Sequence, residues 1–247
     1  MVFYKQKEFT LLIDLSINLL ASVIFFIIGY TLTTTRRYIK NKDYYKFFNT
    51  IINSKCSVFL STRQGPNPES TLRVSFSEMI AYSKINEKLS ELGIKTEALD
   101  SLSDINQIDS ENIFVLGGHF ANTITKKYWE QINNKLPLKL IPQKRQIIIG
   151  ERIYEPQIKD NGVYITTYSL IMRINNPIKQ NGYIFSSLGL NGFGTLAGTL
   201  AMLDRKSIKK INTKVNNNNF VALVEAKVEN KKVYCYEIIE IYPLYDM

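Results

Sequence analysis

The chain has 247 residues, and its 31 Lys and Arg against 22 Asp and Glu give a formal net charge of +9. With 45% hydrophobic and 12% aromatic residues, the composition excludes a disordered or collagen-like protein. Two Cys cannot cross-link a small secreted scaffold, and with a single His they cannot form a zinc site of the usual kind. The length suffices for one large domain or two small ones.

An apolar segment lies near the N-terminus, at residues 10–32. Its central part, Leu12 to Tyr30, contains no Lys or Arg, and as a helix it would extend roughly 28 Å, close to the hydrocarbon core of a bilayer. The basic residues that follow it are Arg36, Arg37, Lys40, Lys42 and Lys46. The segment predicts a transmembrane helix, and a cleaved signal peptide and a buried core helix are the alternatives.

The basic residues after this helix predict its orientation. By the positive-inside rule, the C-terminal part lies in the cytoplasm and the short N-terminus lies outside, in a single-pass protein of an inner or plasma membrane. We expect an extracytoplasmic N-terminus at residues 1–9, a transmembrane helix at 10–32, a basic juxtamembrane stem at 33–53 and a cytosolic domain at 54–247.

One face of the predicted transmembrane helix is small or polar. Asp14, Asn18 and Ser22 recur every fourth residue, so they drift by only about 80° around the helix axis. In lipid, such a face permits close approach and hydrogen bonds between helices, which predicts a homo-oligomer. The alternative is that Asp14 and Asn18 lie at the outer headgroups, in contact with water.

The remaining sequence predicts one α/β domain. Segments typical of strands are 56–61, 112–116, 138–141, 146–149, 163–174 and 182–188. Segments typical of helices are 76–92, 120–132 and 195–203. Residues 220–228 and 232–242 predict an antiparallel hairpin around Asn230. Since apolar strands followed by helices indicate a mainly parallel sheet, we expect a Rossmann-like three-layer α/β/α sandwich with a C-terminal antiparallel hairpin.

The charge of this domain does not indicate a nucleic-acid-binding protein. Residues 47–247 carry 24 basic and 19 acidic side chains, a net charge of +5 spread over the whole region. A nucleic-acid-binding face concentrates its positive charge in a patch or stripe. We therefore expect no specific binding of nucleic acid.

Two glycine-containing turns between a strand and a helix are candidate ligand sites. The first contains Gly117, Gly118, His119, Asn122 and Thr123. Its glycines let a ligand approach the backbone, and the amides at the start of the next helix favour an anion. His119 is a candidate acid or base, or an incidental residue of the turn.

The second turn contains Gly189, Asn191, Gly192, Gly194 and Thr195, in the spacing G-x-x-G-x-G-T. No Lys follows the last glycine, so a triphosphate-binding P-loop is not indicated. We expect a backbone cradle for a phosphate, a carboxylate or a ribose, with Thr195 as the helix cap. The alternative is a tight turn whose glycines serve packing only.

A third candidate is the pair Arg173 and Asn176, placed just before Pro177. Pro177 favours an extended conformation of the residue before it, and Arg173 could point into the same cleft. A buried structural ion pair of Arg173 is the alternative.

The segments LGGHFAN, MRINNP and LGLNGFGTLAG together resemble a family of uncharacterised bacterial and archaeal α/β domains. That family carries GG-P-x-x-N, then R-x-x-NP, then G-x-x-G-x-GT. The resemblance covers most of residues 55–243 and implies no activity. The chain departs from the pattern at His119, where the family has Pro.

The preferred hypothesis is a membrane-anchored sensor or effector that binds a small anionic ligand, a nucleotide or a derivative of one, in bacterial signalling or phage defence. The second is an enzyme acting on nucleotides or a nicotinamide dinucleotide, a hydrolase or a glycosyl-transferring enzyme, with Glu78 or His119 as the acid or base. Deoxyribosyltransferase-like and TIR-like domains, which share a Rossmann-like sheet, use a catalytic Glu. The third is a membrane-tethered scaffold without a ligand. The pattern assigns no cofactor.

Overall fold

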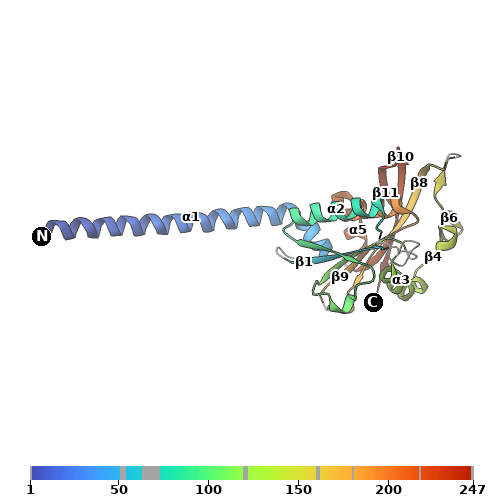
Figure 1. Cartoon of the computed structure of the whole chain (residues 1–247), viewed down its shortest axis with the longest axis horizontal. Helices are drawn as coiled ribbons and strands as arrows, with labels where there is room; N and C mark the ends of the chain where they lie inside the picture. The colour runs from blue at the N-terminus through green and yellow to red at the C-terminus, as the bar shows by residue number, and fades with distance from the viewer. Residues whose placement is uncertain are drawn as a thin grey trace. The chain divides into compact units, whose positions relative to one another are not determined.

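Figure 1 shows the computed structural model of the chain. The structure describes residues 2–50, 54–62, 73–118, 122–159, 162–179, 181–216 and 218–245, and of residues 2–14 it describes the backbone alone. The chain divides into two compact units, Met1–Lys42 and Asp43–Met247. Each unit is described by itself.

Helix α1 (Val2–Phe48) supplies the whole of the first unit. Its part from Leu15 onward is long and apolar enough to cross a membrane, with a mean hydropathy of 2.1 in its most apolar stretch. The large apolar side chains between Leu15 and Leu32 are exposed. Because a core helix buries such side chains, the core-helix alternative does not fit this segment.

The last turns of α1 belong to the second unit and are part of its core. The buried aromatic residues here are Tyr44, Tyr45, Phe47 and Phe48. The Tyr45 hydroxyl donates to the Leu92 carbonyl at 2.8 Å, and the Tyr44 hydroxyl donates to the Leu203 carbonyl at 3.1 Å. The segment that sequence reasoning assigned to a juxtamembrane stem therefore contains residues that hold the domain together.

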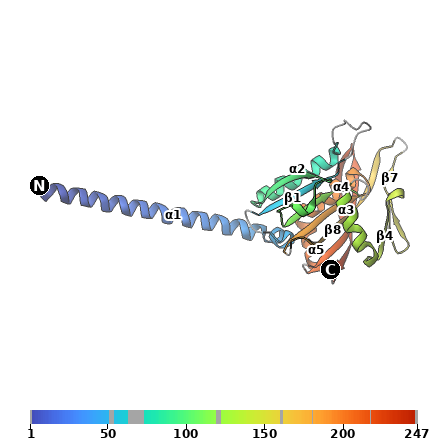
Figure 2. The ribbon, with the colours of Figure 1, turned by 60° about the horizontal axis from the view of Figure 1, so that its bottom comes forward.

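A mixed sheet runs through the second unit in the order β11-β10-β8-β9-β3-β1-β2, with β7 beside β8. Strands β1, β7 and β8 of this sheet are labelled in Figure 2. Its strands are β1 (Lys55–Leu60), β2 (Lys95–Asp100), β3 (Asn112–Leu116), β7 (Gln157–Ile158), β8 (Tyr164–Asn175), β9 (Tyr183–Gly189), β10 (Asn219–Glu229) and β11 (Lys232–Leu244). Neighbours from β2 to β9 pair in parallel, and neighbours from β9 to β11 pair antiparallel.

The α/β class is confirmed, but the expectation of a mainly parallel sheet is wrong, and the Rossmann-like three-layer sandwich is not confirmed. The reason lies between β8 and β9, which are joined by the short loop at residues 176–182. A connection of this length permits antiparallel neighbours only, since parallel strands need a long crossover. The predicted hairpin of β10 and β11 is present, and its turn residues Asn230 and Lys231 both have positive φ.

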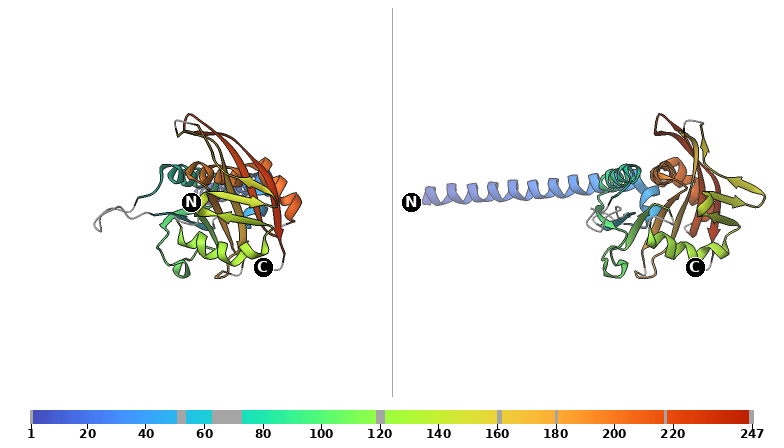
Figure 3. Two further views of the ribbon diagram at one scale, coloured as in Figure 1. Left: turned by 90° about the vertical axis from the view of Figure 1, so that its right-hand side faces the viewer. Right: turned by 45° about the vertical axis from the view of Figure 1, so that its right-hand side comes forward.

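Helices and a small second sheet cover the main sheet. Helices α2 (Phe76–Glu91), α4 (Gly192–Leu203) and α5 (Arg205–Val215) share one hydrophobic core with the end of α1. Helix α3 (Thr123–Ile132) and strand β4 (Leu138–Ile141) share the other. Strand β4 forms the small sheet with β5 (Gln146–Ile149) and β6 (Arg152–Tyr154), visible beside the main sheet in Figure 3. Strand β2 and helix α5 had no counterpart in the predicted elements.

Arg173 lies in the core of the domain and not in a ligand cleft. Its side chain is fully buried on β8, and its guanidinium lies over the rings of Phe47, Tyr183 and Phe220. It donates hydrogen bonds to the carbonyls of Phe47, at 3.0 Å, and Asn218. Burial lowers the pKa of Arg173 to about 10, so the group stays charged at neutral pH.

The Phe47 carbonyl is in the last turn of α1, where carbonyl groups lack an intrahelical partner. Arg173 supplies that partner, and Asn112 does the same for the Phe48 carbonyl at 2.9 Å. The structural role expected for Arg173 is therefore different in kind. Among the described residues it donates to backbone carbonyls and forms no ion pair.

We expect Arg173→Met to lower the free energy of unfolding by about 2–5 kcal/mol, because it removes a charged donor from the buried Phe47 carbonyl and from the Asn218 carbonyl. The measurement is denaturant unfolding of the detergent-solubilised chain, followed by the fluorescence of its single Trp, Trp129. The matched control is Arg205→Met, which removes a half-exposed ion pair to Asp43 and should cost less than about 1 kcal/mol. Equal losses in the two variants would contradict the assignment.

Candidate functional site

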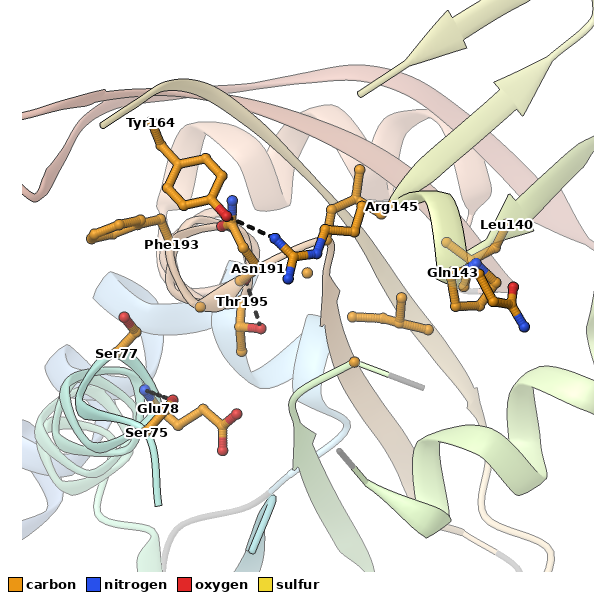
Figure 4. A pocket seen from close by; sticks show the side chains of 16 residues that line it. Ser75, Ser77, Glu78, Leu140, Gln143, Arg145, Tyr164, Asn191, Phe193 and Thr195 are labelled. Atoms are coloured by element: carbon orange, nitrogen blue, oxygen red, sulfur yellow. Dashed lines mark hydrogen bonds between the residues drawn. The ribbon is translucent and has the colours of Figure 1, made fainter. Parts of the chain in front are cut away.

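A pocket of about 520 Å³ lies at the edge of the main sheet where β9 ends and α4 begins (Figure 4). Five segments line it: the start of α2, Gly118 after β3, the turn from β9 into α4, residues 140–145 from the end of β4 to the start of β5, and Tyr164 at the start of β8. Its volume falls within the range of about 300–1,000 Å³ usual for small-molecule sites.

The two predicted glycine turns meet in this pocket. Strands β3 and β9 are parallel neighbours, with Leu116 opposite Ser187, so both strands end at the same edge of the sheet. A Cβ atom added to Gly118 would lie 3.1 Å from the carbonyl oxygen of Gly189. The backbones of the two turns are therefore in contact, and a ligand in the pocket reaches both.

The second turn is closed by Asn191. Its Oδ1 accepts a hydrogen bond from the Gly194 amide at 2.9 Å, and its side chain is held by the Thr167 hydroxyl at 3.0 Å. Asn191 is thus the cap of α4, and the helix begins at Gly192; the expectation that Thr195 is the cap is wrong. The reason is that the Asn191 side chain reaches the amide of the third residue of the helix, Gly194, as capping requires.

Gly189 has no room for a side chain. An added Cβ would lie 2.1 Å from the Thr195 amide nitrogen and 2.6 Å from the Asn191 carbonyl oxygen. Glycine at this position lets the strand end lie directly against the first turn of α4. The first amides of α4, those of Gly192 and Phe193, have no intrahelical acceptor and form the positive end of the helix dipole.

Glu78 brings a carboxylate to the same pocket from the first turn of α2. Ser75 caps that helix by accepting from the Glu78 amide at 3.2 Å. The Glu78 side chain is 5% exposed, and its carboxylate accepts from the Ser61 amide at 3.0 Å and from the Ser61 hydroxyl. Gly117, with φ +102°, leaves space for both, since an added Cβ would lie 2.8 Å from Ser61 Oγ and 3.0 Å from Glu78 Oε1.

Arg145 approaches the pocket from the small sheet. It follows the 3-10 helix η3 (Pro142–Lys144), with φ 52°, and its guanidinium donates to the Tyr164 hydroxyl at 2.8 Å. The Tyr164 ring packs edge-on against Phe193, with 6.1 Å between ring centroids. In Figure 4, Arg145 and Tyr164 lie away from Glu78 and Ser75, with Thr195 between the two groups.

Sequence reasoning missed Arg145, Tyr164 and Phe193 as site residues. The segment around Arg145 was predicted as two β-prone runs without a role, and Tyr164 as part of a strand. A Pro-Gln-Lys-Arg turn between two such runs was the available signal. Nothing in the local sequence placed this turn over a pocket formed by residues distant in the chain.

Two residues of the first turn form hydrogen bonds to backbone groups and do not line the pocket. Asn122 is buried, donates to the Leu116 carbonyl at 3.0 Å and caps α3 through its Oδ1. The Thr123 hydroxyl donates to the Ser101 carbonyl at 2.9 Å. His119 lies outside the described residues.

Asn176 lies at the other edge of the sheet. Its side-chain amide donates to the Glu111 carbonyl at 2.9 Å, and its Oδ1 accepts from the Ile178 amide at 3.0 Å. Because β8 runs antiparallel to β9, the end of β8 lies beside the beginning of β9, so neither Arg173 nor Asn176 lines the pocket.

The polar residues of the predicted helix-association face are exposed where they are described. Asn18 and Ser22 are exposed on α1, and the Ser22 hydroxyl donates to the Asn18 carbonyl within the helix at 2.8 Å. The side chain of Asp14 lies outside the described residues.

No family model matches the sequence, and no curated protein matches it. Among the described residues, no group of three or more His, Cys, Asp or Glu side chains could hold a metal ion. The pocket is therefore the feature of the described structure that bears on function.

We expect Gly189→Ala to destabilise the domain by at least about 2 kcal/mol, because the new Cβ meets backbone atoms that cannot move independently. The matched control is Gly192→Ala in the same turn, where the added Cβ would meet the end of the Ser77 side chain, 3.0 Å away. The hydroxyl can rotate, and the Ser77 Cβ, 3.2 Å from the added atom, has to move by only a few tenths of an ångström, so the control should change stability by less than about 1 kcal/mol. Thermal or denaturant unfolding measures both, and a tolerated Gly189→Ala would refute the close packing of the turn.

Proposed function

We propose that the domain is a binding module for a small anionic ligand, a nucleotide or a derivative of one, and that the pocket at the β9–α4 turn is its site. The observation that carries this proposal is the meeting of the two glycine turns in one pocket with Arg145 at its rim. Among the described lining residues, Arg145 carries the one positively charged side chain.

Three groups in the pocket favour an anion. The guanidinium of Arg145 matches the geometry of a phosphate or carboxylate and can donate two parallel hydrogen bonds. The opening amides of α4 supply further donors at the positive end of a helix. The side-chain amide nitrogen of Asn191 is buried and has no hydrogen-bond partner among the described residues. Since such a donor is costly to leave unsatisfied, an acceptor on a ligand would stabilise it.

A planar group on the ligand has an aromatic wall to contact. Tyr164 and Phe193 both line the pocket beside Arg145. Stacking of a nucleic-acid base on an aromatic side chain contributes about 1–3 kcal/mol where it has been measured. An anion site beside an aromatic wall supports a nucleotide over a bare inorganic anion.

We expect Arg145→Gln to weaken binding of AMP about 10- to 100-fold, since it removes a charged donor worth about 1.5–3 kcal/mol to an anion. The measurement is isothermal titration of the detergent-solubilised chain with AMP. Lys144→Gln is the matched control, because it removes the adjacent positive charge from an exposed residue that does not line the pocket. An equal effect of both substitutions would indicate general electrostatic attraction in place of a site.

The proposal places the domain in the cytoplasm, attached to an inner or plasma membrane by α1 with its N-terminus outside. The basic residues that follow the apolar part of α1 support this orientation. Self-association of the helix through Asp14, Asn18 and Ser22 would make the protein a homo-oligomer. A membrane-anchored, ligand-binding oligomer suits a sensor or effector of bacterial signalling or phage defence, and this part of the proposal rests on architecture alone.

The two Cys residues test the orientation. Cys235 is exposed on β11, whereas Cys56 is buried on β1, where burial raises the pKa of its thiol well above the usual range. We expect a membrane-impermeant maleimide to label Cys235 in permeabilised cells and to leave intact cells unlabelled. Cys235→Ser should abolish the signal, because the Cys56 thiol is inaccessible. Labelling of intact cells would reverse the topology.

A second candidate function is an enzyme acting on nucleotides or a nicotinamide dinucleotide. The observation that favours it is the carboxylate of Glu78, which lines the pocket while almost fully buried. Such a carboxylate has the position of an acid or base toward a bound ligand. Hydrolysis of NAD or a nucleotide by the purified protein, abolished by Glu78→Gln, would favour the enzyme; binding without turnover would favour the sensor.

A further inference from the structure

Helix α5 presents basic side chains along one face. Its 11 residues include no Asp or Glu, and five of them are basic: Arg205, Lys206, Lys209, Lys210 and Lys214. These five residues are exposed, whereas Ile208, Ile211 and Val215 are buried. At about 100° per residue, the basic residues occupy about half of the helix circumference, and they extend about 14 Å along its axis. We call them the basic face of α5.

Helix α2, which shares a hydrophobic core with α5, carries its charges in balanced pairs. Lys84 pairs with Glu87 at 2.7 Å, and Lys88 pairs with Glu91 at 2.6 Å. No such pair can form within α5, because the helix contains no acidic residue. Its positive charge is therefore concentrated, in contrast to the mixed charge usual for a solvated surface.

Three carboxylates from outside the helix lie near the basic face. The Asp43 carboxylate lies 3.0 Å from Arg205 Nε and 3.8 Å from Lys209 Nζ. The Glu237 carboxylate lies 3.9 Å from Lys210 Nζ. The third, that of Asp204, caps α5. Five basic groups against three carboxylates leave an excess of positive charge, and neither Lys206 nor Lys214 takes part in these pairs.

The position of Asp43 places the basic face near the point where the chain leaves the domain. Asp43 is the first residue of the second unit, and it pairs with the first two turns of α5. Residues 33–42 separate it from Leu32, the last residue of the predicted transmembrane segment. Even fully extended, this stretch spans at most about 40 Å. Whatever the arrangement of the two units, the start of α5 is held within that distance of a bilayer crossed by α1.

An anionic membrane surface is the partner that this connection favours. Clusters of about four to eight Lys and Arg beside a membrane segment, or on an amphipathic helix, attract anionic lipid headgroups. Residues 33–42 carry Arg36, Arg37, Lys40 and Lys42 and no acidic residue, and α5 adds its basic face within reach of the same bilayer. Because the connection keeps the two surfaces together, a weak attraction is sufficient. A nucleic acid would have to bind from solution without this advantage.

The contact with lipid would be electrostatic. The apolar side chains of α5 lie in the core of the domain, so the helix cannot insert among the acyl chains. Its basic face can reach headgroups only. Such an attraction weakens with salt, since the Debye length is about 10 Å at 0.1 M ionic strength and about 3 Å at 1 M.

We infer that the basic face of α5 binds anionic lipid headgroups of the membrane that α1 crosses, so that a second contact holds the domain at the bilayer. This inference rests on the membrane attachment in the proposed function and is independent of the ligand pocket.

The experiment places a fluorophore in the middle of the basic face. Thr213 is exposed on α5, so Thr213→Cys combined with Cys235→Ser provides one accessible thiol, since Cys56 is buried. The full chain is labelled in detergent and reconstituted into symmetric vesicles that carry a nitroxide on some headgroups. We expect quenching at least about twofold stronger with about 30% phosphatidylserine than with phosphatidylcholine alone. The difference should disappear at about 1 M salt.

Charge reversal on α5 tests the cause of the quenching. Lys206→Glu combined with Lys214→Glu changes two exposed residues and leaves the pairs of Asp43 in place, and it should abolish the effect of phosphatidylserine. The matched control is Lys126→Glu combined with Lys127→Glu on α3, which packs in the other core, and it should keep the effect. Glutamine in place of both α5 lysines should leave about half of the effect, and provides the measurement if the reversed variant does not fold.

The outcomes separate this inference from the proposed function. Equal quenching in the two kinds of vesicle, or an equal loss in the α3 control, would overturn the role of α5 and leave the anchor and the pocket unaffected. Binding of a fluorescent RNA duplex that is lost in the α5 variant, without any effect of phosphatidylserine, would assign the face to nucleic acid and also overturn the inference. A chain that does not float with phosphatidylcholine vesicles would overturn the membrane attachment, and this inference with it.

Discussion

The candidate site depends on the parallel pairing of β3 with β9. Because these strands run the same way and lie side by side, their carboxyl ends bring two glycine turns, far apart in the chain, into backbone contact at Gly118 and Gly189. Every other wall of the pocket is arranged around this contact. Helices α2 and α4 begin at the same edge and present their first turns, and the small sheet brings Arg145 to it.

The antiparallel pairing of β9 with β8 determines which residues cannot line the pocket. From β9 through β11 the strands alternate in direction, so loops of this half do not all reach the pocket edge. Arg173 and Asn176 follow the sequence pattern of a ligand loop but lie on β8 or at its far end. There they stabilise backbone carbonyls, including those at the end of α1. The three sequence motifs therefore contain residues of two kinds: those of the glycine turns that line the pocket, and those, such as Arg173 and Asn176, that bind backbone carbonyls.

The last turns of α1, from Asp43 on, are part of the domain core and not a solvated stem. Tyr44, Tyr45, Phe47 and Phe48 lie in the core, and buried side chains from the sheet bind the last carbonyls of the helix. A stem predicted from basic composition is usually a solvated connection. Here Phe48 packs against Phe185 and Phe114, so the last turn of α1 cannot change position without disturbing that packing.

The sequence by itself determined the elements with a strong local signal. Strands such as Asn112–Leu116, the hairpin at Asn230 and the apolar N-terminal helix follow from periodicity, turn residues and length. It also located both glycine turns and Glu78. Strand β2 and helix α5 escaped because their residues are largely polar or charged and their burial depends on neighbours.

Only the tertiary structure decided which of these residues share a pocket. Strand direction is set by the length of a connection and by the packing on both sheet faces, neither of which a local motif encodes. For this reason Arg145 and Tyr164 line the pocket although no recognisable motif contains them. For the same reason Arg173, Asn122 and Asn176 do not line the pocket. Each donates a hydrogen bond to a backbone carbonyl within the fold.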